Sequence, residues 1–116
     1  MQSQNDITIE TRDTVTILHI HGDITVFSEP FLQEAYGKAK QHGTHRLLLN
    51  FDENAYINSG GIALLIQLLA EARGLDQKVA ITGLSNHYKK IFTMLGITKF
   101  AKVYDSIDEA TRGIIG

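Results

Sequence analysis

The segment AYINSGGI, residues 55–62, leads from an apolar approach through Asn-Ser-Gly-Gly directly into an amphipathic helix. In that helix Ile62, Leu65, Ile66 and Leu69 follow the i, i+3, i+4, i+7 spacing, which predicts a helix from about residue 59 to Gly74. Before the segment, residues 46–51 contain three consecutive leucines, a run typical of a strand buried on both faces. A buried strand followed by such a helix is the building unit of an α/β fold.

The N-terminal third of the chain adds a hairpin and a helix to this unit. Residues 6–11 and 14–21 alternate apolar and polar side chains, so two strands are predicted, with a turn at Arg12-Asp13. Gly22 stops the second strand. Ser28 is then the predicted N-cap of a helix with Pro30 in its first turn, and Gly43 is predicted to end that helix.

The C-terminal third repeats the alternation of strand and helix. Residues 78–82 are predicted as a strand, and Ser85 and Gly96 as the cap and the end of a third helix. A short strand near Val103 precedes a last helix, which starts at the capping box of Ser106 and Glu109. The order β-β-α-β-α-β-α-β-α predicts one α/β domain, with a mixed, largely parallel sheet covered by about four helices. The predicted core comprises Leu47, Leu49, Ile57, Ile62, Leu65, Leu69, Ile81 and Leu95.

The composition of the chain excludes or disfavours several classes of protein. A length of 116 residues suits one domain, and a net charge of -2 disfavours a nucleic-acid binder. The chain has no cysteine, which excludes disulfides and cysteine-ligated zinc. The longest apolar stretch, 62–72, is too short to span a bilayer, and the N-terminus lacks the pattern of a signal peptide. We therefore expect a cytoplasmic protein with no direct membrane insertion and no cofactor.

Ser59 is the candidate functional residue. It follows a predicted strand and opens a helix, where free N–H groups and a partial positive charge suit an anion. Gly60 and Gly61 leave its hydroxyl sterically open. From the residues alone, the plainer interpretation is that Asn58 or Ser59 is simply the N-cap and that the glycines shape the turn. A nucleotide-binding P-loop is disfavoured because no lysine follows the glycines.

The pattern Asn50-x7-Asn58-Ser59-Gly60-Gly61 resembles the signature of STAS-domain anti-sigma-factor antagonists. Three further segments resemble that family in order and spacing: residues 22–25 with Pro30 after them, residues 79–84, and residues 92–110. The resemblance covers nearly the whole chain, so one STAS domain is expected over residues 1–116.

The resemblance implies a switch and no catalysis by this chain. It implies that Ser59 is phosphorylated by an anti-sigma factor that is itself a serine kinase, and that a metal-dependent serine phosphatase reverses the modification. The unphosphorylated form would bind the kinase and so release the sigma factor. The implied partner-binding residues are Asn58, Gly60, Gly61, Asp23, Thr25, Phe27 and Ser28, with Val26 beside them.

The sequence departs from the family pattern around this serine. Asn50, Asn58 and Thr25 stand where the family usually has aspartate, and Gly60 replaces a serine or threonine. Asparagine keeps the shape and a carbonyl acceptor but loses the charge, so the departures bear on the efficiency of phosphorylation more than on the fold.

Several alternatives remain open at this point. The same fold could serve as a non-switching STAS subunit of a membrane transporter, or as a sensor of a small ligand or nucleotide. The spacing of His19 and His21 would suit a metal, although a pair of packing histidines is the simpler interpretation. The sequence does not fix the oligomeric state or name the cognate kinase.

Overall fold

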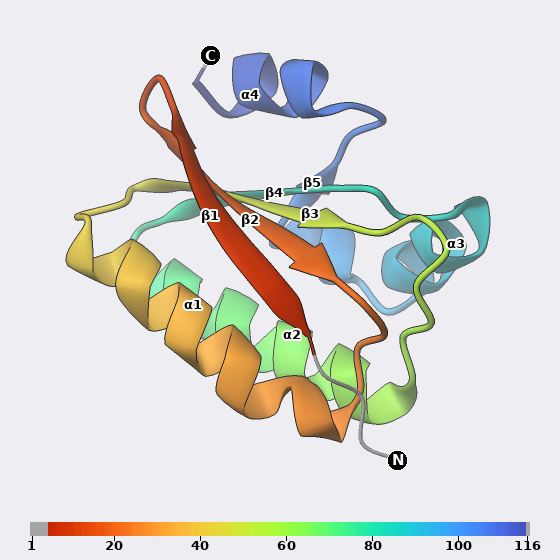
Figure 1. The fold of residues 1–116 in the computed structure, drawn as a ribbon. Coiled ribbons are helices and arrows are strands. Elements are labelled where there is room, and N and C mark those ends of the chain that lie inside the picture. Colours follow the sequence, from red (N-terminus) through yellow and green to blue (C-terminus); the bar gives the residue numbers. More distant parts are fainter. Residues whose placement is uncertain (1–4, 116) are drawn as a thin grey trace.

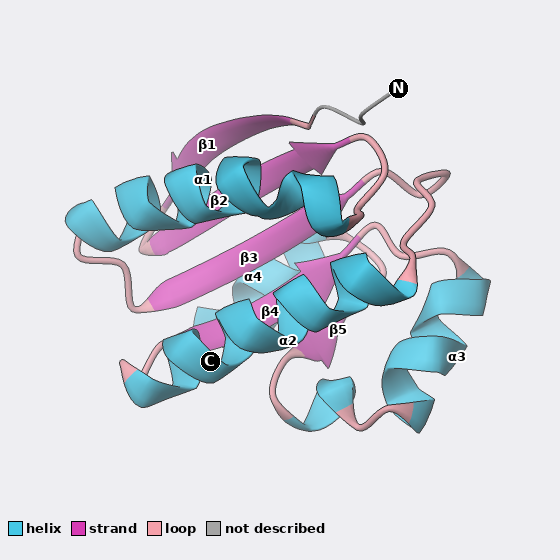
Figure 2. Cartoon of the chain, turned by 90° about the horizontal axis from the view of Figure 1, so that it is seen from below, coloured by secondary structure: helices cyan, strands magenta, loops and turns pink. Residues whose placement is uncertain are grey.

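The computed structural model describes residues 5–115, in which a five-stranded sheet lies between helices (Figure 1). Helices α1, α2 and α3 cover one face, and α4 covers part of the other (Figure 2). The elements are β1 Asp6–Arg12, β2 Val15–His21, α1 Glu29–Gln41, β3 Arg46–Phe51, α2 Ser59–Gly74, β4 Lys78–Thr82, α3 Asn86–Met94, β5 Lys102–Val103 and α4 Ile107–Ile115. The part of the chain that the structure describes also contains two 3-10 turns, η1 Val26–Ser28 and η2 Ile97–Lys99.

The strands lie side by side in the order of the sequence. β1 and β2 form an antiparallel hairpin, and β2, β3, β4 and β5 are parallel neighbours. The predicted fold class, a mixed and largely parallel sheet, is confirmed. The hairpin turn lies one residue later than predicted, because Arg12 still pairs with Val15 and Asp13 takes the positive φ of 56°.

Local capping signals set most helix ends. Asn58, Ser85 and Ser106 each accept a hydrogen bond from the backbone N–H three residues ahead, at the starts of α2, α3 and α4. Gly43 and Gly96 adopt left-handed φ angles of 69° and 77° just past α1 and α3, a conformation that glycine adopts without strain. These predicted boundaries are confirmed.

The larger core lies between the sheet and α1, α2 and α3, and a smaller one lies under α4. Of the predicted core residues, Leu47, Leu49, Ile57, Leu65, Leu69 and Ile81 are buried. The prediction that Leu95 belongs to the core was wrong, because this residue is 55% exposed at the end of α3. Within residues 5–115, no helix combines the length and apolar character needed to cross a bilayer.

The buried face of α2 is rotated from the predicted one. Ile66 is 45% exposed and Ile62 is half-buried, whereas Leu64 and Leu68 are buried with Leu65 and Leu69. Almost every position from 62 to 69 is apolar, so the spacing alone does not determine which side faces the sheet.

Candidate functional site

Two loops meet where β2 and β3 end, and α2 begins from the second of them. Ile24 and Ile57 form an isolated parallel bridge between the loops. The Ile24 N–H donates to the Tyr56 carbonyl at 2.8 Å, and the Asn58 N–H donates to the Ile24 carbonyl at 3.1 Å. The loop that precedes η1 is therefore bound directly to the segment that delivers Ser59.

Side chains fix the same pair of loops. The Asp52 carboxylate accepts from the Gly22 N–H and contacts the His21 ring, both at 3.0 Å. Asp23 accepts from the Tyr56 N–H at 2.9 Å, and the Tyr88 hydroxyl accepts from the Ile57 N–H at 2.8 Å.

Asp52 and Tyr88 are parts of this site that the sequence did not predict. Nothing local distinguishes them, because each acts on backbone about 30 residues away in the chain.

Asn58, rather than Ser59, is the N-cap of α2. Its side-chain carbonyl accepts from the Gly61 N–H at 2.9 Å, and its backbone carbonyl accepts from the Ile62 N–H at 2.9 Å. Ser59 is thus the first residue of the helix, and its side chain is exposed. Among residues 5–115, no hydrogen bond joins its hydroxyl to another side chain, so no general base is in place beside it.

The two glycines allow α2 to start directly against the neighbouring loop. A side chain at Gly61 would overlap the backbone carbonyl of Ile24, and one at Gly60 would lie 3.3 Å from the backbone nitrogen of Val26. Gly61 is buried and Gly60 is half-buried. Their shared role is close approach of two backbones, which places Val26 next to the first turn of α2.

The loop from Asp23 to Ser28 divides into exposed and buried parts. Val26 and Phe27 are 58% and 51% exposed, and Thr25 caps η1 by accepting from the Phe27 N–H. Ser28 was predicted to contact a partner, but it is fully buried. Its hydroxyl accepts from the Thr25 N–H and donates to the Asp23 carbonyl. Burial excludes Ser28 from any contact surface, and its side chain does not cap α1.

The site carries no positive side chain of its own. Residues 22–28 and 52–61 contain no lysine or arginine, whereas Asp23, Asp52 and Glu53 are acidic and exposed. A phosphate on Ser59 would find the partial positive charge of the helix N-terminus but no cation from these loops.

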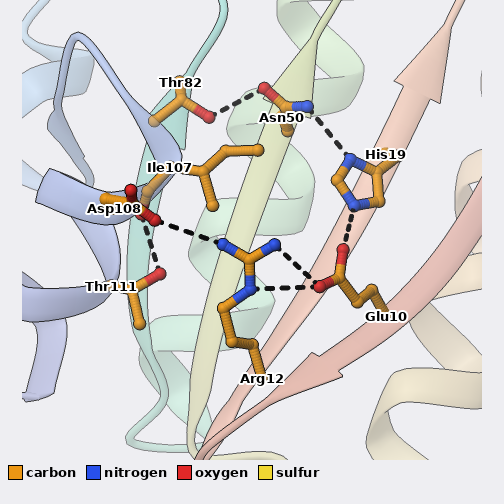
Figure 3. A network of polar contacts seen from close by, with 8 residues as sticks. All are labelled: Glu10, Arg12, His19, Asn50, Thr82, Ile107, Asp108 and Thr111. Atoms are coloured by element: carbon orange, nitrogen blue, oxygen red, sulfur yellow. Dashed lines mark hydrogen bonds and ion pairs between the residues drawn. The ribbon is translucent and has the colours of Figure 1, made fainter.

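Asn50 belongs to a separate polar network on the α4 face of the sheet (Figure 3). Its carbonyl accepts from Thr82 at 2.9 Å, and its amide nitrogen lies 3.0 Å from Nδ1 of His19. The other ring nitrogen of His19 lies 2.8 Å from Glu10, which also accepts from Arg12. The network links four strands and does not reach the Ser59 hydroxyl.

The structure does not favour the metal site considered for His19 and His21. Their rings contact different carboxylates, Glu10 and Asp52. The part of the chain that the structure describes contains no group of three or more potential metal ligands.

Comparisons with known proteins bear on this arrangement. A family model of the STAS domain matches residues 6–110. The anti-sigma-B factor antagonist of Staphylococcus aureus is 23% identical over 103 residues, covering 89% of this chain and 95% of that protein.

Solved structures share the fold. The crystal structure of an anti-sigma factor antagonist from Mycobacterium paratuberculosis has a TM-score of 0.82 at 18% identity, covering 97% of this chain and 96% of that one. The Bacillus cell fate determinant SpoIIAA in its phosphorylated form has a TM-score of 0.67 at 12% identity, covering 94% and 99%. At these identities the structural matches establish a common fold.

Proposed function

The chain belongs to the STAS-domain family and is similar to anti-sigma-factor antagonists, and from this premise we propose that it is a partner switch controlled by phosphorylation of Ser59. In its unmodified form it binds an anti-sigma factor that is a serine kinase, and that binding frees the sigma factor. The observation that carries the proposal is the exposed Ser59 hydroxyl, held at the first turn of α2 between two interlocked loops.

The proposed contact surface is formed by the exposed and half-buried residues around Ser59. Asn58, Gly60, Asp23, Thr25 and Phe27 belong to it, with Val26 beside them. Val26 and Phe27 supply exposed apolar area, which a protein partner can bury. Gly61 supports the surface from within, because it is buried against Ile24.

The modification transfers the γ-phosphoryl group of ATP to the Ser59 oxygen, with loss of the hydroxyl proton and release of ADP. The active site for this transfer belongs to the kinase, and this chain supplies the acceptor. A metal-dependent serine phosphatase hydrolyses the phosphoserine and restores the binding form.

Phosphorylation opposes binding through desolvation. The phosphate adds a charge of about -1.5 to -2 at a surface that has no cation in the neighbouring loops. Covering this group with a partner that lacks a paired arginine or lysine costs several kcal/mol. A loss of about 4 kcal/mol weakens binding roughly a thousandfold, which suffices for a switch.

The test uses each anti-sigma-factor serine kinase encoded in the same genome, purified and incubated with this protein and ATP. We expect mass spectrometry to map the phosphate to Ser59 and binding titrations to show the loss of affinity. Ser59→Ala should bind without being modified, and Ser59→Asp should bind weakly.

Ser106→Asp is the matched control, because it adds the same charge at the N-terminus of α4. It should bind the kinase as the unmodified protein does. Phosphate on another residue, or equal binding of the phosphorylated and unmodified forms, would show that Ser59 is not the switch.

A further inference from the structure

β5 covers only part of the outer edge of β4. Its two residues pair with Ala80 and Ile81, whereas β3 pairs with the whole of β4 on the other side. Within residues 5–115, Lys78 and Val79 therefore have no strand beside them on the outer side. Figure 2 shows β5 as a short strand next to β4. An unpaired strand edge can template the addition of another chain.

The open edge presents one free backbone group outward, the N–H of Val79. The Lys78 N–H donates to the His45 carbonyl on the β3 side at 2.8 Å. Successive N–H groups along a strand point to opposite sides, so that of Val79 points away from β3. An extended peptide placed ahead of β5 can pair with this part of β4.

A hollow flanks the edge on each face of the sheet. The hollow on the α2 side, about 470 Å³, is lined by Leu69, Arg73, Gln77, Val79, Lys99 and Phe100. The hollow on the α4 side, about 320 Å³, shares Val79 and Phe100 and adds Lys102, Tyr104 and Ile114 among its walls. Side chains of a strand alternate between faces, so an added strand would direct alternate side chains into the two hollows.

Four cationic side chains surround the edge, namely those of Arg73, Lys78, Lys99 and Lys102. Among the described residues, no acidic side chain lines either hollow. None of the four forms an ion pair within the described part of the chain. The nearest acid by sequence, Asp76, lines an adjoining hollow with Lys78. This concentration of positive charge in a chain of net charge -2 is complementary to an acidic partner.

Aromatic rings hold two of these cations at the edge. The Arg73 guanidinium lies 5.1 Å from the centre of the Phe100 ring, and the Lys102 ammonium lies 5.4 Å from that of Tyr104. A cation stacked in this way keeps its charge and loses conformational freedom. It is therefore available to a carboxylate at a lower entropic cost.

We propose that the outer edge of β4 binds an extended acidic segment of a partner protein, which adds as a strand beside Lys78 and Val79. A main-chain hydrogen bond from the Val79 N–H aligns the segment, alternate apolar side chains enter the two hollows, and carboxylates contact the four cations. A peptide fits better than single-stranded nucleic acid, because a peptide carbonyl can accept from the Val79 N–H and because a cation already occupies one face of each aromatic ring, Arg73 on Phe100 and Lys102 on Tyr104.

The proposed strand-binding edge is remote from Ser59. The two are joined by α2, and 14 residues separate Ser59 from Arg73, a rise of about 21 Å. A partner at the β4 edge can thus bind together with a kinase at the Ser59 end, and the proposal does not depend on the proposed switch.

The probe is a fluorescein-labelled peptide of alternating glutamate and valine, with binding measured by fluorescence anisotropy. We expect the unmodified protein to bind it, and the double variant Arg73→Glu, Lys99→Glu to bind about tenfold more weakly or worse. The matched control is Lys38→Glu with Lys90→Glu, which makes the same change of net charge elsewhere and should leave the affinity within about twofold. Ser59→Asp should bind the peptide as the unmodified protein does.

Strand addition itself is tested on the ligand, so that no variant of the protein has to fold. Methylation of alternate backbone nitrogens in the peptide should abolish binding, because methyl groups on the side facing β4 keep the peptide backbone away from the Val79 N–H, while every charge is retained. The proposal is overturned if the methylated peptide binds equally well, if an oligothymidylate of the same charge binds as tightly, or if the unmodified protein does not bind the peptide.

Discussion

At the scale of single residues, Asn50 has a role that an aspartate could not fill unchanged. Its carbonyl oxygen accepts from the Thr82 hydroxyl, which leaves its amide to donate to Nδ1 of His19. Nε2 of His19 faces Glu10 at 2.8 Å. An aspartate at this position has no N–H to offer Nδ1 of His19. Asn50 and its neighbour His19 on β2 are thus complementary as hydrogen-bond donor and acceptor.

Glu10 makes this network sensitive to acid. The hydrogen bond from His19, and then that from Arg12, hold the pKa of Glu10 below its ordinary value of 4.5. A carboxylate whose pKa is lowered by folding stabilises the folded state above the unfolded pKa, and this contribution is lost as the pH falls through the folded pKa. We predict that Glu10→Gln is less stable than the parent at pH 7, and that the difference shrinks below about pH 4.5.

Urea unfolding at a series of pH values measures this difference. Glu53→Gln is the control, because Glu53 is exposed and forms no ion pair within residues 5–115. Its stability difference from the parent should be small and independent of pH. The same constant difference for Glu10→Gln would contradict the role of the carboxylate.

At the scale of elements, local signals predicted the order of strands and helices and nearly all the helix ends. Those signals act within a few residues, as the caps of α2 and α3 show. The side of α2 that is buried could not be predicted, because it is selected by packing against the sheet and nearly all positions from 62 to 69 are apolar. Ser28 lies at the predicted N-cap position of α1, but its hydroxyl bonds to Thr25 and Asp23 and does not cap the helix. Its burial by tertiary packing, which local sequence does not signal, is why it is not a partner contact.

The identity of the buried side of α2 gives a prediction about stability. Leu65 is 1% exposed and belongs to the larger core, whereas its neighbour Ile66 is 45% exposed. Leu65→Ala should lower the free energy of unfolding by about 2–5 kcal/mol, and Ile66→Ala by less than about 1 kcal/mol. Chemical denaturation of both variants decides the matter. Equal losses would mean that α2 is rotated relative to the structure.

The junction between η1 and α2 gives a second prediction at this scale. Gly61→Ala forces its new methyl group against the Ile24 carbonyl, so the loop and the helix must separate. We expect a loss of about 1–3 kcal/mol in unfolding free energy. The control is Gly37→Ala in α1, where nothing lies within 4 Å of the added group; there, alanine should stabilise by up to about 1 kcal/mol. Thermal or urea unfolding of the pair measures both effects, and similar stabilities would refute the close contact.

At the scale of the whole molecule, α2 connects two ends with different properties. Its N-terminus lies with the loops that follow β2 and β3, which carry acidic side chains and the exposed Val26 and Phe27. Its C-terminus lies beside the cationic edge of β4. The apolar face of the helix is packed into the core along its length. A change of charge at one end of α2 is therefore not expected to displace the other end.

This rigidity predicts that modification of Ser59 changes the surface and not the fold. A negative group at Ser59 lies at the positive end of the α2 dipole, which stabilises it by about 0.3–1 kcal/mol. Ser59→Asp and the phosphorylated protein should therefore unfold within about 1 kcal/mol of the unmodified protein. In amide NMR spectra, shifts should be confined to residues 22–28 and 52–63, and residues 77–79 at the β4 edge should not move. Loss of stability by several kcal/mol, or shifts spread through the sheet, would mean that the charge acts by unfolding α2, and an interface mechanism would then be excluded.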